Sequence, residues 1–262
     1  MDPEEILAAY DQQQRVAYEY PDMRKEILPH VTRHLRPAPG LSLILHSRLD
    51  KSNADQVIQE QIADFTQLKL PFTWKVYRHD QPPDLGERLA AAGFEPDSDP
   101  PDAIMVLDLQ ETPGSLLGSN PIQVRKLTQP DELEDVIRVE QQVWGGNFDW
   151  IRARMGSHLA VPGYLSVFVA YQAGQPACTG WTYYNLKGQF AGLWGGSTVP
   201  GHRRRGLYTA LVATRAQEAR RRGMRFLTLD ASPMSQPITE KLGFRCISYA
   251  HEHRWRARHT PT

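Results

Sequence analysis

The sequence lacks the features that mark several large classes of protein. Its 262 residues include two cysteines, Cys178 and Cys246, which are too few for a disulfide framework and lack the spacing of a metal site. No apolar run approaches the length of a membrane span. The acidic start Met-Asp-Pro-Glu-Glu has neither the basic nor the apolar region of a secretory signal. We therefore expect a cytoplasmic protein without a metal site or a membrane partner.

The chain also lacks net charge, but this balance hides an asymmetry. Residues 1–120 hold 11 basic against 20 acidic side chains, and residues 121–262 hold 19 against 10, so the halves carry −9 and +9 and differ by 18 charges. A basic half fits a polyanionic ligand, and an acidic half could attract cationic substrates or dock against the basic half. Ordinary surface variation is the less favoured alternative. Overall neutrality argues against a nucleic-acid binder, although residues 251–259 form a basic stretch.

One segment, Val199-Pro200-Gly201-His202-Arg203-Arg204-Arg205-Gly206-Leu207-Tyr208, joins a predicted strand to a predicted helix. Residues 190–199 are rich in aromatic and β-branched side chains, and apolar residues repeat at helical spacing from Leu207 onward. The pattern predicts that the helix starts at the arginines. The first turn of a helix offers unpaired N–H groups and the positive end of its dipole, so this segment is typical of a phosphate-binding turn, with Gly206 allowing close approach.

The remaining pattern predicts alternating strands and helices on either side of a linker at 109–121. Before the linker we expect strands at 41–46, 72–76 and 104–107 and helices at 54–68 and 85–92. After it we expect strands and helices in the order strand, helix, three strands, helix, strand, helix, strand, ending at Trp255. We assign one domain to residues 1–115 and another to residues 120–262.

The ordered motifs of the second half resemble the GNAT superfamily of acyl-CoA N-acyltransferases. The matching pieces are Val199-Pro200, the turn Arg203-Arg204-Arg205-Gly206-Leu207-Tyr208, and Lys241-Leu242-Gly243-Phe244 after the next strand. The resemblance covers residues 122–256. It implies a mixed α/β (α+β) fold with a central, mostly antiparallel twisted sheet flanked by helices. The first half repeats the order of elements and ends in Gly93-Phe94 without an arginine turn, so we interpret it as a smaller, degenerate GNAT-like domain.

The resemblance implies acetyl-CoA as co-substrate. The turn would then hold the pyrophosphate and the outer phosphates, and the end of the preceding strand would hydrogen-bond the pantetheine arm and the thioester carbonyl, where loss of an oxyanion donor typically costs about 2.7–4 kcal/mol. The expected cofactor contacts are Ser197, Thr198, Val199, Arg203, Arg204, Arg205, Gly206, Leu207, Tyr208, Thr209, Ser232 and Ser235.

Two positions depart from the family pattern. Tyr208 stands where Gly or Ala is commoner, and Thr239 stands where many members carry a tyrosine that protonates the departing thiolate. Because a thiol has a pKa of about 8.5, the thiolate can leave with little protonation. Ser235 is a substitute donor, and its alternative role is to cap a short helix.

An amine acceptor with a pKa near 10 must lose a proton before it attacks, so a carboxylate or a water that it holds is expected near the thioester. Glu140 and Asp149 are the candidates, against the alternatives of a solvated helix face and a turn residue. His158 could also serve as a base, or could be an exposed loop residue. The aromatic residues Trp144, Phe148 and Trp150 crowd the loop that covers the acceptor in this superfamily, or belong to the core.

These observations favour an acetyltransferase that moves acetyl from acetyl-CoA to a primary amine of a small molecule. Two alternatives stay open: an acyl-CoA-binding sensor or interaction module without turnover, and a protein N-acetyltransferase whose acidic half grips a basic tail. We expect a monomer or a homodimer.

Overall fold

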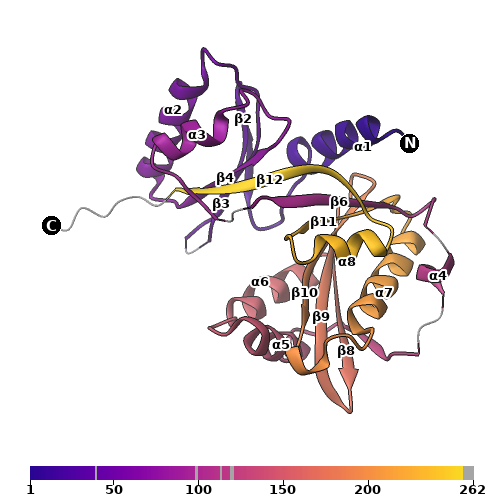
Figure 1. The fold of residues 1–262 in the computed structure, drawn as a ribbon. Coiled ribbons are helices and arrows are strands. Elements are labelled where there is room, and N and C mark those ends of the chain that lie inside the picture. The colour runs from indigo at the N-terminus through magenta and orange to yellow at the C-terminus, as the bar shows by residue number, and fades with distance from the viewer. Residues whose placement is uncertain (39, 98–99, 113, 119–120, 256–262) are drawn as a thin grey trace. The chain divides into compact units, whose positions relative to one another are not determined.

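The structure, a computed structural model, describes residues 1–38, 40–97, 100–112, 114–118 and 121–255 (Figure 1). The basic stretch beyond Trp255 and part of the predicted linker fall outside these residues. The chain forms two compact units that interleave along the sequence. Unit 1 comprises Met1–Met105, Asp230–Pro237 and the C-terminal segment from Cys246, and unit 2 comprises Val106–Leu229 and Ile238–Arg245. No helix in the described part of the chain is both long and apolar enough to cross a membrane.

Unit 1 is built around a sheet with the strand order β1-β2-β3-β4-β12. Neighbouring strands are antiparallel except for β3 and β4, which are parallel. Strand β5 pairs with β12, and β6 leads from this unit into the other. The elements are α1 Pro3–Tyr10, the π-helical turn η1 Asp11–Val16, β1 Arg24–Ile27, β2 Val31–Leu35, β3 Ser42–Ser47, α2 Ala54–Leu68, β4 Phe72–Tyr77, α3 Leu85–Ala91, β5 Glu95–Pro96, β6 Asp102–Asp108 and β12 Arg245–Trp255.

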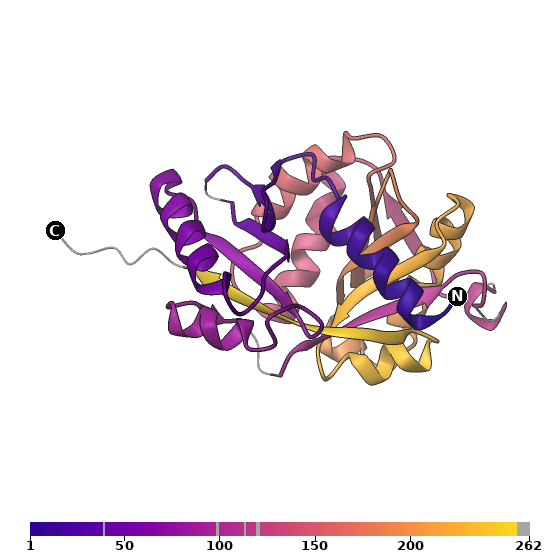
Figure 2. The same cartoon turned by 90° about the horizontal axis from the view of Figure 1, so that it is seen from above.

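The core of unit 1 forms where α2 meets the sheet (Figures 1 and 2). Helix α2 buries Val57, Ile58 and Phe65 at the spacing of one helical face. The ring of Phe65 stacks on Phe72 of β4 with centroids 3.9 Å apart, and Phe94 after α3 meets Phe72 edge-on at 5.3 Å. This apolar face explains why the α2 boundaries could be predicted correctly from periodicity.

In unit 2 the strands pair in the order β7-β8-β9-β10-β11. Its strands are antiparallel except for β10 and β11, which are parallel. The elements are α4 Gly114–Leu117, β7 Val124–Leu127, η2 Pro130–Leu133, α5 Glu134–Trp144, α6 Trp150–Leu159, β8 Leu165–Gln172, β9 Gln175–Tyr184, β10 Phe190–Thr198, η3 Pro200–His202, α7 Leu207–Arg221, β11 Phe226–Ala231 and α8 Gln236–Lys241. Strand β11 and helix α8 each cross a unit boundary.

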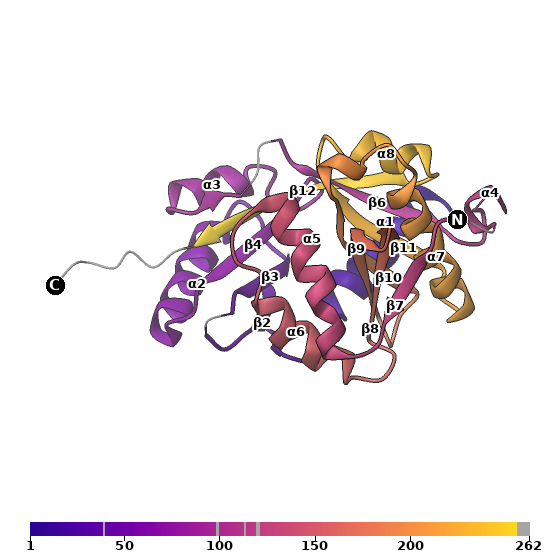
Figure 3. The ribbon, with the colours of Figure 1, turned by 90° about the horizontal axis from the view of Figure 1, so that it is seen from below.

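Helices α5 and α7 cover opposite faces of the unit 2 strands (Figure 3). On one face, Ser197 of β10 contacts α5. On the other face, a Cβ added at Gly180 of β9 would meet Leu211 of α7 at 2.7 Å. These strands are therefore buried on both faces, which agrees with the nearly continuous burial of β8 and β9.

The two units share the same order of strands and helices. In each, a strand, a helix and a parallel strand are followed by a short helix, as β3-α2-β4-α3 and as β10-α7-β11-α8. Both short helices end at a left-handed glycine followed by phenylalanine: Gly93 with φ 99° before Phe94, and Gly243 with φ 94° before Phe244. The first half thus repeats the order of elements of the second half.

Some expected features differ in the structure. Residues 150–159, interpreted as a loop, form helix α6, and strands β1 and β2 were not predicted. The compact units do not follow a boundary at 115 and 120, because β12 comes late in the sequence yet pairs with β4. The assignment of domains to 1–115 and 120–262 stays a prediction.

Candidate functional site

The arginine turn connects β10 to α7 through an unusual backbone path. Pro200–His202 forms the short helix η3, Arg203 is extended, Arg204 has φ 61° and Gly206 has φ 77°. A left-handed conformation is readily adopted by glycine and costs a side-chain-bearing residue such as Arg204 free energy. Helix α7 begins at Leu207. The arginines therefore precede the helix, and the prediction that the helix starts at them is wrong.

The start of α7 is built to receive an anion from outside the chain. No side chain of the described residues caps it, its first turn carries no acidic residue, and its first helical hydrogen bond runs from Ala210 N to Gly206 O at 2.9 Å. The earlier N–H groups of a helix have no intrahelical acceptor. Arg203, Arg204 and Arg205 are exposed, and no carboxylate of the described residues pairs with them. The turn therefore combines free amides, a helix dipole and three cations.

Strand β10 parts from β11 just before this turn. The parallel register covers Phe190 to Gly192, after which β10 stays paired with β9 as far as Thr198. A bulge between Trp194 and Ser197 shifts the β9 pairing by one residue. Beyond Gly192, β10 therefore has one edge that can contact an extended ligand.

The predicted cofactor contacts at the end of β10 differ in which of their hydrogen-bonding groups are already used within the chain. Ser197 is buried, and the Thr198 hydroxyl lies 3.1 Å from the Cys178 sulfur. Val199 was expected to contact the pantetheine arm, but its N–H donates to Ala177 O at 2.9 Å and its carbonyl accepts from His202 N at 2.8 Å. The backbone of Val199 is therefore already used within unit 2.

Glu140 lies against the bulged end of β10. It is 4% exposed on α5, and its Oε2 accepts a hydrogen bond from Ser197 Oγ at 3.1 Å. The indole Nε1 of Trp144, one helical turn later, donates to the same Ser197 oxygen at 2.9 Å. Within the described chain, the buried Oε1 of Glu140 has no hydrogen-bond partner. The Glu140 carboxyl group thus has one oxygen that can still accept a hydrogen bond, beside the strand expected to carry the thioester.

The surroundings of Glu140 favour its neutral form. Burial raises the pKa of Glu140 to about 7, against the opposing effect of the hydrogen bonds from Ser197 and Trp144. A carboxyl group with this pKa exchanges its proton near neutral pH, as a general base must. Glu140 and Ser197, predicted separately as base and cofactor contact, are brought together by the fold.

Tyr208 occupies the space left by a glycine. A Cβ added at Gly196 of β10 would lie 2.8 Å from Cε2 of the Tyr208 ring. Like Ile122 and Val124, Tyr208 packs against a core cluster that includes Phe168 and Leu211, and burial raises the pKa of its hydroxyl. The large residue in the motif is therefore accommodated by a missing side chain on the facing strand.

The remaining candidates have local structural roles. The Ser235 hydroxyl donates to Ser232 O at 3.1 Å within a turn of the segment assigned to unit 1. Thr239 is fully buried. The roles of Ser232 and Ser235 at a cofactor site stay predictions.

The residues around α6 also have defined places. Asp149 precedes α6 and makes a local turn with Asn147, whose side-chain amide donates to it at 2.9 Å. His158 lies on α6, 3% exposed, with Nδ1 2.9 Å from the Tyr183 hydroxyl, so it is not an exposed loop residue. Trp144 and Trp150 are 66% and 44% exposed. Their exposure excludes the core alternative and leaves both rings available to a ligand.

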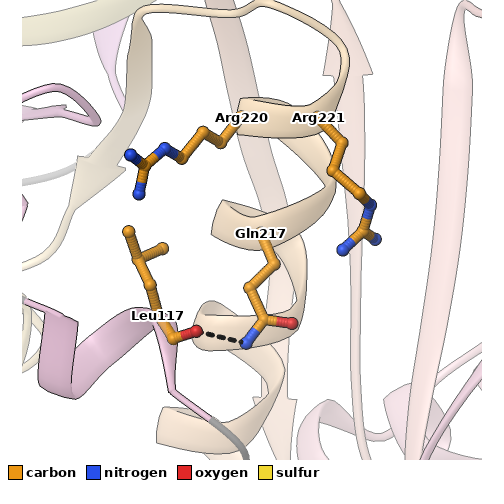
Figure 4. Close-up of a pocket in the computed structure, with 4 residues that line it drawn as sticks. All are labelled: Leu117, Gln217, Arg220 and Arg221. Atoms are coloured by element: carbon orange, nitrogen blue, oxygen red, sulfur yellow. Dashed lines mark hydrogen bonds between the residues drawn. The ribbon is translucent and has the colours of Figure 1, made fainter.

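A surface hollow of about 530 Å³ lies at the far end of α7 (Figure 4). Leu117, Gln217, Arg220 and Arg221 line it, and the Gln217 amide donates to Leu117 O at 3.0 Å. Helix α7 has 15 residues, which places this hollow roughly 20 Å from the arginine turn. Cations in the last turn complement the helix dipole, which explains Arg220 and Arg221 without a ligand. No cluster of metal-binding side chains occurs among the described residues.

Comparisons with known proteins agree with this geometry. Residues 124–244 match the family model described as the acetyltransferase (GNAT) family, and no curated protein matches the chain. A GCN5-related N-acetyltransferase from Kribbella flavida has a similar structure, with a TM-score of 0.70 at 14% identity over 98% of this chain and 96% of that one. A tandem GNAT protein from the clavulanic acid biosynthesis pathway gives 0.63 at 15% identity, over 96% and 88%. A functionally unknown conserved protein from Staphylococcus epidermidis gives 0.64 at 12%, over 90% and 94%.

At these identities the solved structures establish the fold, and they do so over both halves of the chain. The family match identifies the domain, since it spans the bulged strand, the arginine turn and the Leu242-Gly243-Phe244 segment. Residues 124–244 form an acetyltransferase domain of the GNAT family.

Proposed function

We propose that the protein transfers the acetyl group of acetyl-CoA directly to a primary amine of a small molecule, with Glu140 as the general base. The observation that carries this proposal is the buried Glu140 carboxyl group, whose Oε1 has no hydrogen-bond partner among the described residues and whose pKa is raised to about 7. Acyl-CoA binding by itself gives no reason to bury an ionisable carboxyl group at the end of β10.

Each residue has a distinct task in this proposal. Acetyl-CoA supplies the acetyl group as a thioester. Arg203, Arg205 and the amides at the start of α7 hold its phosphates. Ser197 fixes one oxygen of Glu140 by donating to it, so the other oxygen is free to accept a proton from the ammonium group of the acceptor.

The acceptor side is lined by aromatic surface. Trp144 reaches Ser197 through its indole nitrogen while most of its ring is exposed, and Trp194 of β10 is 51% exposed. Ser197 and Trp194 oppose Thr179 and Trp181, two residues apart on β9, so both side chains emerge on the α5 face of the sheet. Exposed indole rings attract ammonium groups, which supports an amine as the acceptor.

The test combines acetyl-CoA titration by calorimetry with thiol release over a panel of amines. We expect saturable binding, amine-dependent release, and a fall in kcat/KM of about 10²–10⁴-fold in Glu140→Gln with little change in acetyl-CoA affinity. Glu134→Gln is the matched control, because Glu134 is an exposed residue of the same helix paired with Arg152. Binding without release for any amine would contradict transfer and favour the sensor alternative. Release with a basic peptide and with none of the small amines would favour a protein acceptor.

A further inference from the structure

Arg215 on α7 is a fully buried cation without an anionic partner. Its side chain is 1% exposed, and within the described chain it makes no ion pair with a carboxylate. Burial lowers the pKa of its guanidinium group, although arginine stays charged in proteins at neutral pH. A charge buried without a counter-ion opposes folding. A residue with this cost is expected to have a specific task.

Main-chain carbonyl groups take up the hydrogen bonds of Arg215. Its Nε donates to Leu211 O in its own helix at 3.4 Å. Its Nη1 donates to Trp194 O of β10 at 3.3 Å and to Trp181 O of β9 at 3.5 Å. Trp181 and Trp194 are the opposed pair at which the regular register of these strands ends. The guanidinium group therefore crosses both strands at the edge of the bulge.

The bulge creates the need for this donor. An extra residue in one strand disrupts the ladder locally, and a buried carbonyl that loses its partner costs free energy. Gly195, inside the bulge, has φ 60°, a conformation that favours glycine. The backbone from Trp194 to Ser197 thus holds an irregular shape that the ladder alone does not enforce.

The β9 strand leaves room for the guanidinium group. A Cβ added at Gly180 would lie 2.8 Å from Nη1 of Arg215 and 2.7 Å from Cδ2 of Leu211. Gly180 and Arg215 therefore fit together on the α7 face of the sheet. Glu140 and Ser197 meet on the opposite face.

We propose that Arg215 is a positioning residue for acetyl transfer, which fixes the bulged backbone of β10 from the α7 face and so holds Ser197 against Glu140 on the other. The inference rests on the proposed function for its link to catalysis. Its structural part, the hold on the bulge, stands on the contacts of Arg215 alone.

The experiment compares Arg215→Met, which has no donors, with Arg215→Lys, which keeps the charge and part of the donor set, and with Gly180→Ala, which pushes on the guanidinium group. Leu211→Ala is the control for lost packing, because Leu211 faces the same part of β9. Two measurements are made well below the melting temperature. The first is hydrogen exchange of the peptide that contains Trp194–Ser197, and the second is steady-state kinetics, which gives kcat and KM for the amine found with the wild type.

We expect Arg215→Met to speed exchange in this peptide at least tenfold and to lower kcat at least tenfold, with Gly180→Ala acting in the same direction and Arg215→Lys falling in between. Leu211→Ala lowers the melting temperature but leaves both quantities within twofold of the wild type. Exchange and kcat within twofold in both Arg215→Met and Gly180→Ala would overturn the inference. If Arg215→Met does not fold, Arg215→Lys and Gly180→Ala decide it by the same two measurements.

The two proposals fail in different ways. A wild-type protein that turns over no amine contradicts the proposed function, and the exchange of the Trp194–Ser197 peptide then still decides whether Arg215 holds the bulge. Normal turnover with a bulge that does not respond to Arg215 leaves the proposed function standing and removes this inference.

Discussion

The ring of Tyr208 fills the space above the Cα of Gly196, so closely that a Cβ there would lie 2.8 Å from the ring. The motif of the turn usually carries a small residue at position 208; here that position holds a tyrosine, and the facing residue on β10 is a glycine. Because Tyr208 is the second residue of α7 and Gly196 lies in the bulge, this contact joins the start of α7, next to the arginine turn, to the strand that carries Ser197.

The contact predicts that Gly196 and Tyr208 are energetically coupled. Gly196→Ala overpacks the site and should lower the free energy of unfolding by about 1–3 kcal/mol. In a protein that already carries Tyr208→Ala, Gly196→Ala should lower the free energy of unfolding by less, with a coupling energy of roughly 1 kcal/mol. Urea unfolding of the two single variants and the double variant measures the coupling. Additive effects would show that the contact does not constrain the bulge.

The arginine turn predicts a loss of acetyl-CoA binding from a local charge reversal. Arg204→Glu combined with Gly206→Asp places negative charge at the start of α7 and a side chain at φ 77°. We expect acetyl-CoA affinity by calorimetry to fall by at least 100-fold.

The matched control for this variant lies at the other end of the same helix. Arg220→Glu with Arg221→Glu reverses two exposed charges of α7 far from the turn, and acetyl-CoA affinity should stay within about threefold of the wild type at physiological ionic strength. Equal losses in the two double variants would mean that overall charge, and not the turn, controls binding.

Glu140 predicts a pH dependence of stability. Its pKa is raised to about 7 in the folded protein from an ordinary value of about 4.5, so the folded state binds this proton more tightly than the unfolded chain. Its contribution is therefore most favourable below pH 4.5 and is lost as the pH rises towards 7, by about 3 kcal/mol in total. Urea unfolding at several pH values should show this decline in the wild type and a smaller one in Glu140→Gln. Parallel pH profiles of the two proteins would contradict the buried, protonated carboxyl group.

Unit 1 predicts a single acetyl-CoA site per chain. At the start of α2, the equivalent of α7, the Asp50 carboxylate accepts hydrogen bonds from Ser52 N at 2.7 Å and Asn53 N at 3.1 Å. An anion of the chain itself thus occupies the amides that a phosphate would need, and the arginines are missing. Calorimetry should give one bound acetyl-CoA per chain, and a second site of comparable affinity would contradict this assignment.

Local sequence signals predicted most elements but failed where the signal was ambiguous. Helix α2 was predicted with its correct bounds because its apolar face repeats at helical spacing. Helix α6 was missed, because the segment from Trp150 to His158 mixes polar residues and glycine with apolar ones and shows no clear apolar face. The start of α7 was placed two to four residues early, because the left-handed Arg204 and Gly206 cannot be distinguished from a first helical turn by composition.

The sequence by itself predicted a phosphate-binding turn at 203–206 and Glu140 as a candidate base, because charge, glycine and helix position are local properties. The tertiary structure decided which of these residues meet. Glu140 and Ser197 are 57 positions apart and come together through the packing of α5 on β10. The burial of Arg215 beneath the bulge likewise depends on strand register, a long-range property that no local pattern of residues encodes.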